Sequence, residues 1–171
     1  MTTESNTELM RRYLEEMWQN RDVSAIERYV DADVLLHDHV DTTGARDTVG
    51  LEAIRDAYRF VSTAFPDYRF TVEQLVGEGD RVIAAFAIEG TNTGELFGTP
   101  PTYRSAQMRA LTMTRWENGK FVEGWQSSDI LGLLRQLGIA SDKVFPAPMR
   151  WMMALRGRRE ARRGRAASAS R

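Results

Sequence analysis

Apolar residues in the first part of the chain recur at the spacing of a helix. Within residues 7–20 they lie at positions i, i+3, i+4, i+7 and i+8, which is the pattern of a helix with one buried face. These residues are Met10, Tyr13, Leu14, Met17 and Trp18. Similar apolar spacing predicts a short second helix over residues 22–30 and a third over residues 51–65. Between these two helices we expect a short strand around Val34–Leu36 and a polar loop over residues 40–50.

From residue 69 the pattern changes to extended runs separated by turn residues. Residues 69–76 and 81–91 form two such runs, and two more lie on either side of Asn118-Gly119, a pair that is typical of a tight hairpin turn. Helical spacing returns after Asp129, and Gly138 ends that helix. Helices segregated from an antiparallel run of strands predict an α+β fold. A curved antiparallel sheet, closed by the three N-terminal helices and the C-terminal helix, would form a cone-shaped barrel with a pocket inside.

Composition and charge limit the classes of protein to consider. The chain is 42% hydrophobic and 27% charged, which is ordinary for a soluble globular protein. We expect no membrane span and, without a recognisable signal peptide, a cytoplasmic location. The absence of cysteine excludes disulfides, thiolate metal sites and a cysteine nucleophile.

The net charge of −1 conceals an uneven distribution along the chain. Residues 150–171 contain eight arginines and one glutamate. We expect one domain over residues 1–140, followed by a linker and a basic, flexible tail over residues 141–171. Because no aromatic residue lies among the arginines from Arg156 to Arg171, we expect no nucleic-acid partner.

A set of short motifs is concentrated in residues 98–138. They are a Gly-x-Pro-Pro-Thr loop, an arginine before a Gly-Lys hairpin, a tryptophan in the next strand, and an aspartate opening a helix that ends Gln-Leu-Gly. The positions are Gly98, Pro100, Pro101, Thr102, Arg104, Arg115, Gly119, Lys120, Trp125, Asp129, Gln136, Leu137 and Gly138. This pattern resembles the SnoaL-like polyketide cyclase family, and the resemblance extends over roughly residues 7–138.

The resemblance implies the cone-shaped α+β barrel of scytalone dehydratase and ketosteroid isomerase. It also implies an enzyme that closes a ring by intramolecular aldol condensation on an aromatic or polycyclic ketone, with no metal or cofactor. Folds of this kind often dimerise through the open face of the sheet, so we expect a homodimer by analogy.

The resemblance assigns the role of general base to Asp129. A base that removes a proton from carbon needs an apolar pocket, where partial desolvation raises the pKa of its carboxylate, and a donor aimed at the enolate oxygen. The residues alone allow a second interpretation, because an aspartate directly before an apolar helix is a preferred N-cap. Both interpretations stay open at this point.

Several residues are candidates for the acid. The cyclases place a histidine three residues before the hairpin arginine, where this chain has Thr112. His37 and His39 are the only histidines, and two residues apart on a strand they face the same side. No further ligand accompanies them, so we expect no metal. Tyr103 and Arg104 lie on the proline-rich loop, where a phenol could donate to an oxyanion and a guanidinium could pair with a substrate carboxylate.

The catalytic candidates are therefore Asp129, His37, His39 and Arg104. The candidates for contact with the substrate are mainly aromatic, and they are Tyr13, Met17, Trp18, Phe60, Tyr103, Thr112 and Trp125. The leading hypothesis is a cofactor-independent, polyketide cyclase-like enzyme. The alternatives are a cofactor-free hydroxylase of polyketide tailoring and a non-catalytic small-molecule binding module with the same fold.

Overall fold

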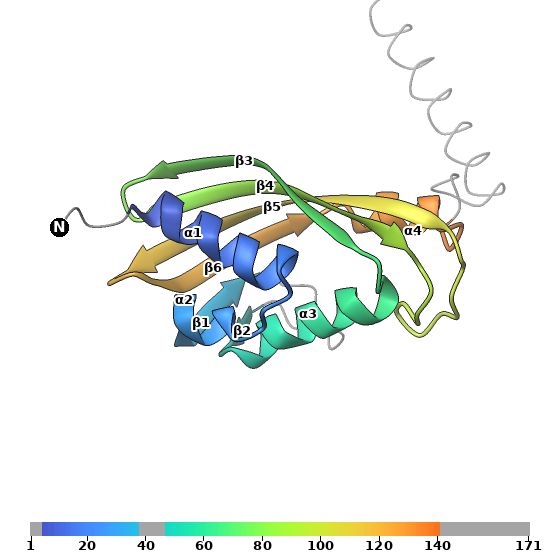
Figure 1. Ribbon diagram of the computed structural model, residues 1–171, viewed down its shortest axis with the longest axis horizontal. Coiled ribbons are helices and arrows are strands. Elements are labelled where there is room, and N and C mark those ends of the chain that lie inside the picture. Colours follow the sequence, from blue (N-terminus) through green and yellow to red (C-terminus); the bar gives the residue numbers. More distant parts are fainter. Residues whose placement is uncertain (1–4, 38–46, 141–171) are drawn as a thin grey trace, which may run out of the picture. The chain divides into compact units, whose positions relative to one another are not determined.

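The computed structural model describes residues 5–37 and 47–140, which form a sheet with helices against it (Figure 1). The helices are α1 (Asn6–Leu14), the π-helical turn η1 (Glu15–Gln19), α2 (Ala25–Tyr29), α3 (Glu52–Ala64) and α4 (Ile130–Gln136). The strands are β1 (Val30–His37), β2 (Asp47–Val49), β3 (Arg69–Glu78), β4 (Arg81–Thr91), β5 (Ser105–Glu117) and β6 (Lys120–Ser128). The α+β class is confirmed. The expected linker and tail over residues 141–171, and His39, lie outside the described residues.

The sheet has the strand order β2-β1-β6-β5-β4-β3, and it is curved without closing into a complete barrel (Figure 1). The antiparallel run from β3 to β6 was predicted, and Asn118 and Gly119 turn between β5 and β6 with φ of 49° and 78°. Two features were not predicted. β1 pairs in parallel with β6, and β2 lies in the stretch expected to be a loop. A three-residue strand is too short to show an alternating pattern.

The curvature of the sheet leaves a space between its inner face and the helices. Register shifts interrupt the β3–β4 pairing between Val72 and Gln74 and the β5–β6 pairing between Arg115 and Trp116. Such bulges bend a strand and increase its twist. Inward-facing positions of the long strands carry small residues, including the buried Ala84 and Ala110. The helices therefore pack over the sheet without filling the space inside its curve.

The loop between β4 and β5 is tied to the end of α3 by Asn92. The Asn92 side chain is buried, and its Nδ2 donates to the carbonyls of Ala64 (3.2 Å) and Gly94 (2.8 Å). Its Oδ1 accepts from the backbone N–H (2.8 Å) and the hydroxyl (3.0 Å) of Thr102. Gly94 touches α3 so closely that a Cβ built there would lie 1.9 Å from the Thr63 carbonyl oxygen. Both ends of this loop are thus held against the helix.

Replacing Gly94 by alanine should lower the free energy of unfolding by about 3 kcal/mol, because a methyl group overlapping main-chain atoms cannot be relieved by a rotamer change. Gly79→Ala is the matched control. Gly79 has a φ of 59° with open space around its Cβ position, so that variant should lose only about 1 kcal/mol from backbone strain. Urea denaturation measures both, and an equal loss in the two variants would contradict the close-approach argument.

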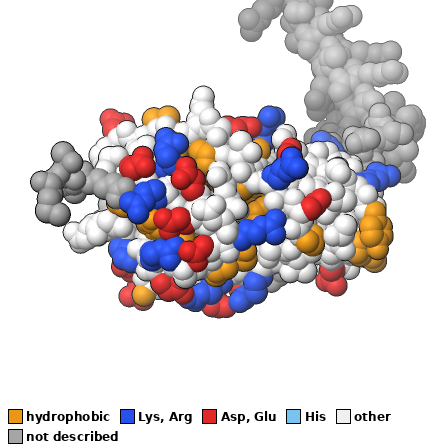
Figure 2. All heavy atoms as spheres, in the orientation of Figure 1, with side chains coloured by type: hydrophobic (Ala, Val, Ile, Leu, Met, Phe, Trp, Pro, Cys, Tyr) orange, Lys and Arg blue, Asp and Glu red, His pale blue; other side chains and the backbone are white. Residues whose placement is uncertain are grey.

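The surface over α1 and α2 carries mixed charges (Figure 2). Arg28 pairs with Glu16 (2.7 Å) and with Asp22 (2.5 Å), which links η1, α2 and the turn between them. Within the part of the chain that the structure describes, no helix has the length and apolar character needed to span a membrane.

Candidate active site

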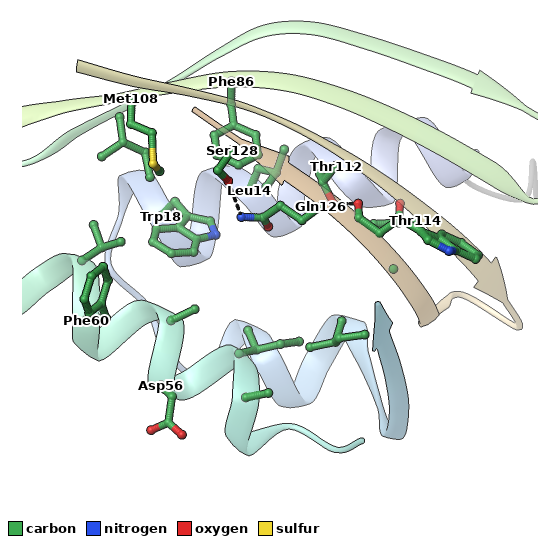
Figure 3. A pocket seen from close by; sticks show the side chains of 18 of the residues that line it. Leu14, Trp18, Asp56, Phe60, Phe86, Met108, Thr112, Thr114, Gln126 and Ser128 are labelled. Atoms are coloured by element: carbon green, nitrogen blue, oxygen red, sulfur yellow. Dashed lines mark hydrogen bonds between the residues drawn. The ribbon is translucent and has the colours of Figure 1, made fainter. Parts of the chain in front are cut away.

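A cavity of about 560 Å³ lies between the inner face of the sheet and the helices α1 and α3 (Figure 3). Its walls are mainly aliphatic and aromatic side chains. Those from the helices include Met10, Leu14, Trp18, Ile54, Phe60 and Val61, and those from the strands include Leu36, Phe86, Ile88, Met108 and Phe121. A cavity of this size and character suits a small, largely apolar ligand.

The polar groups of the cavity come from alternate positions of β5 and β6. Thr112, Thr114, Gln126 and Ser128 project from the inner face of the sheet, as the alternation of a strand requires (Figure 3). The Gln126 Nε2 donates to the Ser128 Oγ over 3.0 Å, and the Thr112 hydroxyl donates to the Trp125 carbonyl over 3.2 Å. These groups are uncharged, so the inner face offers hydrogen bonds without a formal charge.

Two further polar groups at the cavity have no hydrogen-bond partner among the described residues. The Oγ1 of Thr48, on β2, is buried and unpaired. Tyr13, on α1, is only 4% exposed, and its ring packs between those of Tyr29 and Phe121 at centroid distances of 6.1 and 6.3 Å. Burial raises the pKa of the Tyr13 phenol, which therefore stays protonated at neutral pH. Tyr13 lines the cavity, and its contact with a ligand stays a prediction.

The ring of His37 lies on the opposite side of the sheet from the cavity. Leu36 pairs with Gly124, and a Cβ built on Gly124 would meet Leu36 and the ring of Phe121, so this pair of positions faces inward. His37 and its cross-strand partner Trp125 are one residue further along and face outward. Both residues also border the cavity, and their rings stack on each other with their centroids 4.9 Å apart.

His37 joins three strands through its two ring nitrogens. Nδ1 lies 3.0 Å from Asp47 Oδ1 on β2, and Nε2 lies 2.9 Å from Glu123 Oε1 on β6. Glu123 also accepts from the Nε of Arg115 at 2.8 Å. The hydrogen bond to Glu123, followed by the one to Asp47, raises the pKa of His37, although partial burial acts against this. The hydrogen bonds from His37 and Arg115 lower the pKa of Glu123.

The raised pKa of His37 predicts a pH-dependent stability. The contribution of His37 should be complete below about pH 6.5, the ordinary pKa of histidine, and should be lost as the pH rises through the higher pKa of the folded protein. The wild type should therefore be more stable than His37→Gln at pH 6, and the difference in Tm should shrink towards pH 9. His39 is present in both proteins, so its titration cancels. Parallel Tm curves over this range would contradict the prediction.

Asp129 acts as the N-cap of α4 in this structure. Its Oδ1 accepts from the backbone N–H of Gly132 at 2.8 Å, and the side chain is exposed. Its neighbours Ser128 and Ile130 line the cavity, whereas Asp129 does not. The expectation that this carboxylate is buried is therefore wrong, because the strand alternation that turns Ser128 inward turns the next residue outward. The role of Asp129 as a general base stays a prediction.

Three other candidates lie away from the cavity. Arg104 is exposed and folds over Gly138 at the end of α4. Tyr103 is 75% exposed. Met17 is fully buried in the core between helix and sheet rather than at the cavity wall. In contrast, Trp18, Phe60 and Thr112 line the cavity, and their contact with a substrate stays a prediction.

The cavity also contains groups that the sequence analysis did not select. Gln126 and Ser128 share the inner face with Gly124, and the alternation from Gly124 onward could have identified them. Asp56 borders the cavity from α3, but its carboxylate points away and pairs with Arg59 (Figure 3). Among the described residues that line the cavity, Asp56 is the only acid and His37 the only histidine.

Solved structures with the same fold include several from bacteria. IdmH from Streptomyces antibioticus, a proposed polyketide cyclase, is 29% identical over 78% of this chain and 99% of its own, with a TM-score of 0.67. AclR from Streptomyces galilaeus, a proposed hydroxylase, is 22% identical over 86% of this chain and 93% of its own, with a TM-score of 0.69. A proposed polyketide cyclase from Acidithiobacillus ferrooxidans is 24% identical over 82% of this chain and all of its own, with a TM-score of 0.67.

No curated protein matches this sequence. The family model described as SnoaL-like polyketide cyclase matches residues 8–137, which include every described helix and all six strands except the first two residues of α1. The motifs of residues 98–138, the curved sheet and the enclosed cavity agree with that match. The chain therefore belongs to the SnoaL-like polyketide cyclase family.

Proposed function

We propose that this protein binds an aromatic or polycyclic ketone in the cavity and closes a ring in it by an intramolecular aldol reaction, without a cofactor. The observation that carries the proposal is the cavity itself, which is lined by aromatic and aliphatic side chains and has uncharged hydrogen-bonding groups on one face. Apolar walls favour flat, apolar ligands, and a few polar groups orient such a ligand by hydrogen bonds to its oxygen atoms.

The donor in this proposal is Tyr13. In an aldol closure, a base removes a proton from the carbon beside one carbonyl, the resulting enolate carbon attacks a second carbonyl, and the alkoxide formed takes up a proton. Negative charge develops on oxygen in both steps, and a preorganised hydroxyl in a dry site stabilises it. Tyr13 meets these conditions because it is buried, protonated, and without a partner among the described residues.

The base in this proposal is Asp129. Its carboxylate caps α4, and it stands between two residues that line the cavity. The role requires the carboxylate to leave the Gly132 N–H and turn towards the bound ketone. A hydrogen bond at an exposed helix end is a weak restraint on such a change, being worth about 1 kcal/mol.

The test is to incubate the purified chain with fused-ring ketones that carry an enolisable side chain positioned to close a six-membered ring. Mass spectrometry separates the outcomes. An aldol product has the mass of its substrate, or that mass less one water, and forms without oxygen. A product heavier by one oxygen atom, formed only in air, would replace the cyclase proposal with the hydroxylase. Binding seen by thermal shift, without any product, would favour the binding module.

The homodimer expected by analogy is part of the same proposal. The outer face of the sheet exposes Val76 and Ile83, which are paired in register, and Leu111 on β5. A second copy would cover this face, and a monomeric mass by light scattering would overturn that expectation.

A further inference from the structure

The loop between β4 and β5 contains a two-residue turn formed by Phe97 and Gly98. Leu96 and Thr99 pair across it through backbone hydrogen bonds of 3.1 and 2.9 Å. Phe97 has a φ of 49° and Gly98 a φ of 73°. These values match the Asn118-Gly119 turn, with 49° and 78°, where asparagine tolerates the left-handed conformation. A bulky residue at this position is a genuine outlier, because its Cβ crowds the backbone.

The turn places the ring of Phe97 at the cavity. Phe97 lines the cavity and is 41% exposed, and its ring centroid lies 4.8 Å from that of Phe60 on α3. Phe60 lies at one end of the cavity and Thr114 at the other (Figure 3). The residue one helical turn before Tyr13 is Met10, whose sulfur contacts the Thr114 hydroxyl at 3.9 Å, so Tyr13 belongs to the end opposite Phe97.

The turn is held firmly in place. Leu96, next to Phe97, is fully buried, and the Thr99 hydroxyl donates back to the Leu96 carbonyl. Asn92 and Gly94 fix the start of the loop against α3. An exposed aromatic ring on a fixed but unfavourable backbone points to a functional reason for its position, because neither exposure nor strain stabilises the fold.

We propose that Phe60 and Phe97 form an outer aromatic subsite that stacks on the distal ring of an elongated, fused-ring ligand. This inference rests on the proposed function, in which the carbonyl end of the ligand reaches Tyr13. A ligand of two fused rings lies within the inner cavity and gains nothing from the outer pair. A ligand of four fused rings extends to the mouth, where it covers the exposed face of Phe97. The subsite thus makes the protein select by the length of the fused-ring system.

The test compares Phe97→Asn with Tyr103→Asn. Both remove an aromatic ring from a residue of positive φ in the same loop, and Tyr103, with a φ of 56°, does not line the cavity. Asparagine tolerates this backbone conformation, so both variants should unfold at the same or a higher temperature than the wild type. The probes are α-tetralone, with two fused rings, and 5,12-naphthacenequinone, with four. Binding is followed by thermal shift and by quenching of tryptophan fluorescence, since Trp18 lines the cavity.

We expect Phe97→Asn to weaken binding of the four-ring probe about tenfold, because one ring stack and its buried area are lost. The same variant should change the affinity for α-tetralone less than twofold. Tyr103→Asn should change neither. If both probes bind the wild type and Phe97→Asn keeps its affinity for the four-ring probe, or loses affinity equally for both, the subsite is overturned while the proposed function stands. If neither probe binds the wild type, the proposed function fails and the subsite fails with it.

Discussion

Replacing Tyr13 by phenylalanine should lower kcat for ring closure about hundredfold, the typical cost of removing one donor from an oxyanion site. Tyr13 lines an apolar cavity and its hydroxyl has no partner among the described residues, so removing the hydroxyl breaks no hydrogen bond within the described fold. For the same reason the variant should be about as stable as the wild type, since the phenol makes no hydrogen bond to the described residues. Steady-state turnover and a thermal melt measure the two effects.

Tyr29→Phe is the matched control for this prediction. Tyr29 packs against the ring of Tyr13, but its hydroxyl donates to Glu16 at 2.8 Å and does not line the cavity. That variant should keep its turnover and lose some stability, the reverse of the result expected for Tyr13. Unchanged turnover in Tyr13→Phe would remove this phenol from the mechanism and leave it as a wall residue.

Replacing Asp129 by asparagine should lower kcat by about 10²- to 10⁴-fold, the range for loss of a positioned general base. Asparagine is as good an N-cap as aspartate, so the hydrogen bond to Gly132 and the start of α4 should survive. The effect on turnover is thereby separated from an effect on the fold. Asp129→Ala would not allow this separation, because it also removes the cap.

Asp56→Asn serves as the second control. Asp56 borders the cavity as a carboxylate that points outward and pairs with Arg59, so its neutralisation should leave turnover unchanged. If Asp129→Asn keeps full turnover as well, Asp129 is only a cap. In that case any chemistry has to proceed without a carboxylate from the described residues, and the binding module becomes the better description.

The elements could largely be predicted from local sequence because their signals are local. The turn at Asn118-Gly119 depends on two residues that tolerate positive φ, and the apolar stripe from Met10 to Trp18 depends only on spacing. The family could be identified for a similar reason, since its motifs fall within residues 98–138 and β5, β6 and α4 follow one another directly.

The composition of the site could be predicted only in part. Trp18 and Phe60 were expected to contact the substrate because they are aromatic. Thr112 was expected there because it occupies the position of the cyclases' histidine. Phe97 was not expected, because nothing in the sequence indicates that a loop residue 37 positions after Phe60 stacks on it. That contact depends on Asn92 and Gly94 fixing the loop against the end of α3.

The sequence by itself determined most of the secondary structure, the α+β class and the family, because periodicity, turn chemistry and motif spacing are properties of residues near one another in the chain. Only the tertiary structure decided which side of the sheet each candidate occupies. The side chains of His37 and Asp129 project from the outer face of the sheet, and those of Gln126 and Ser128 from the inner face, through the register of β1 on β6 and the bulge between Arg115 and Trp116. A shift of one residue in a strand reverses every side chain, and long-range pairing sets that shift.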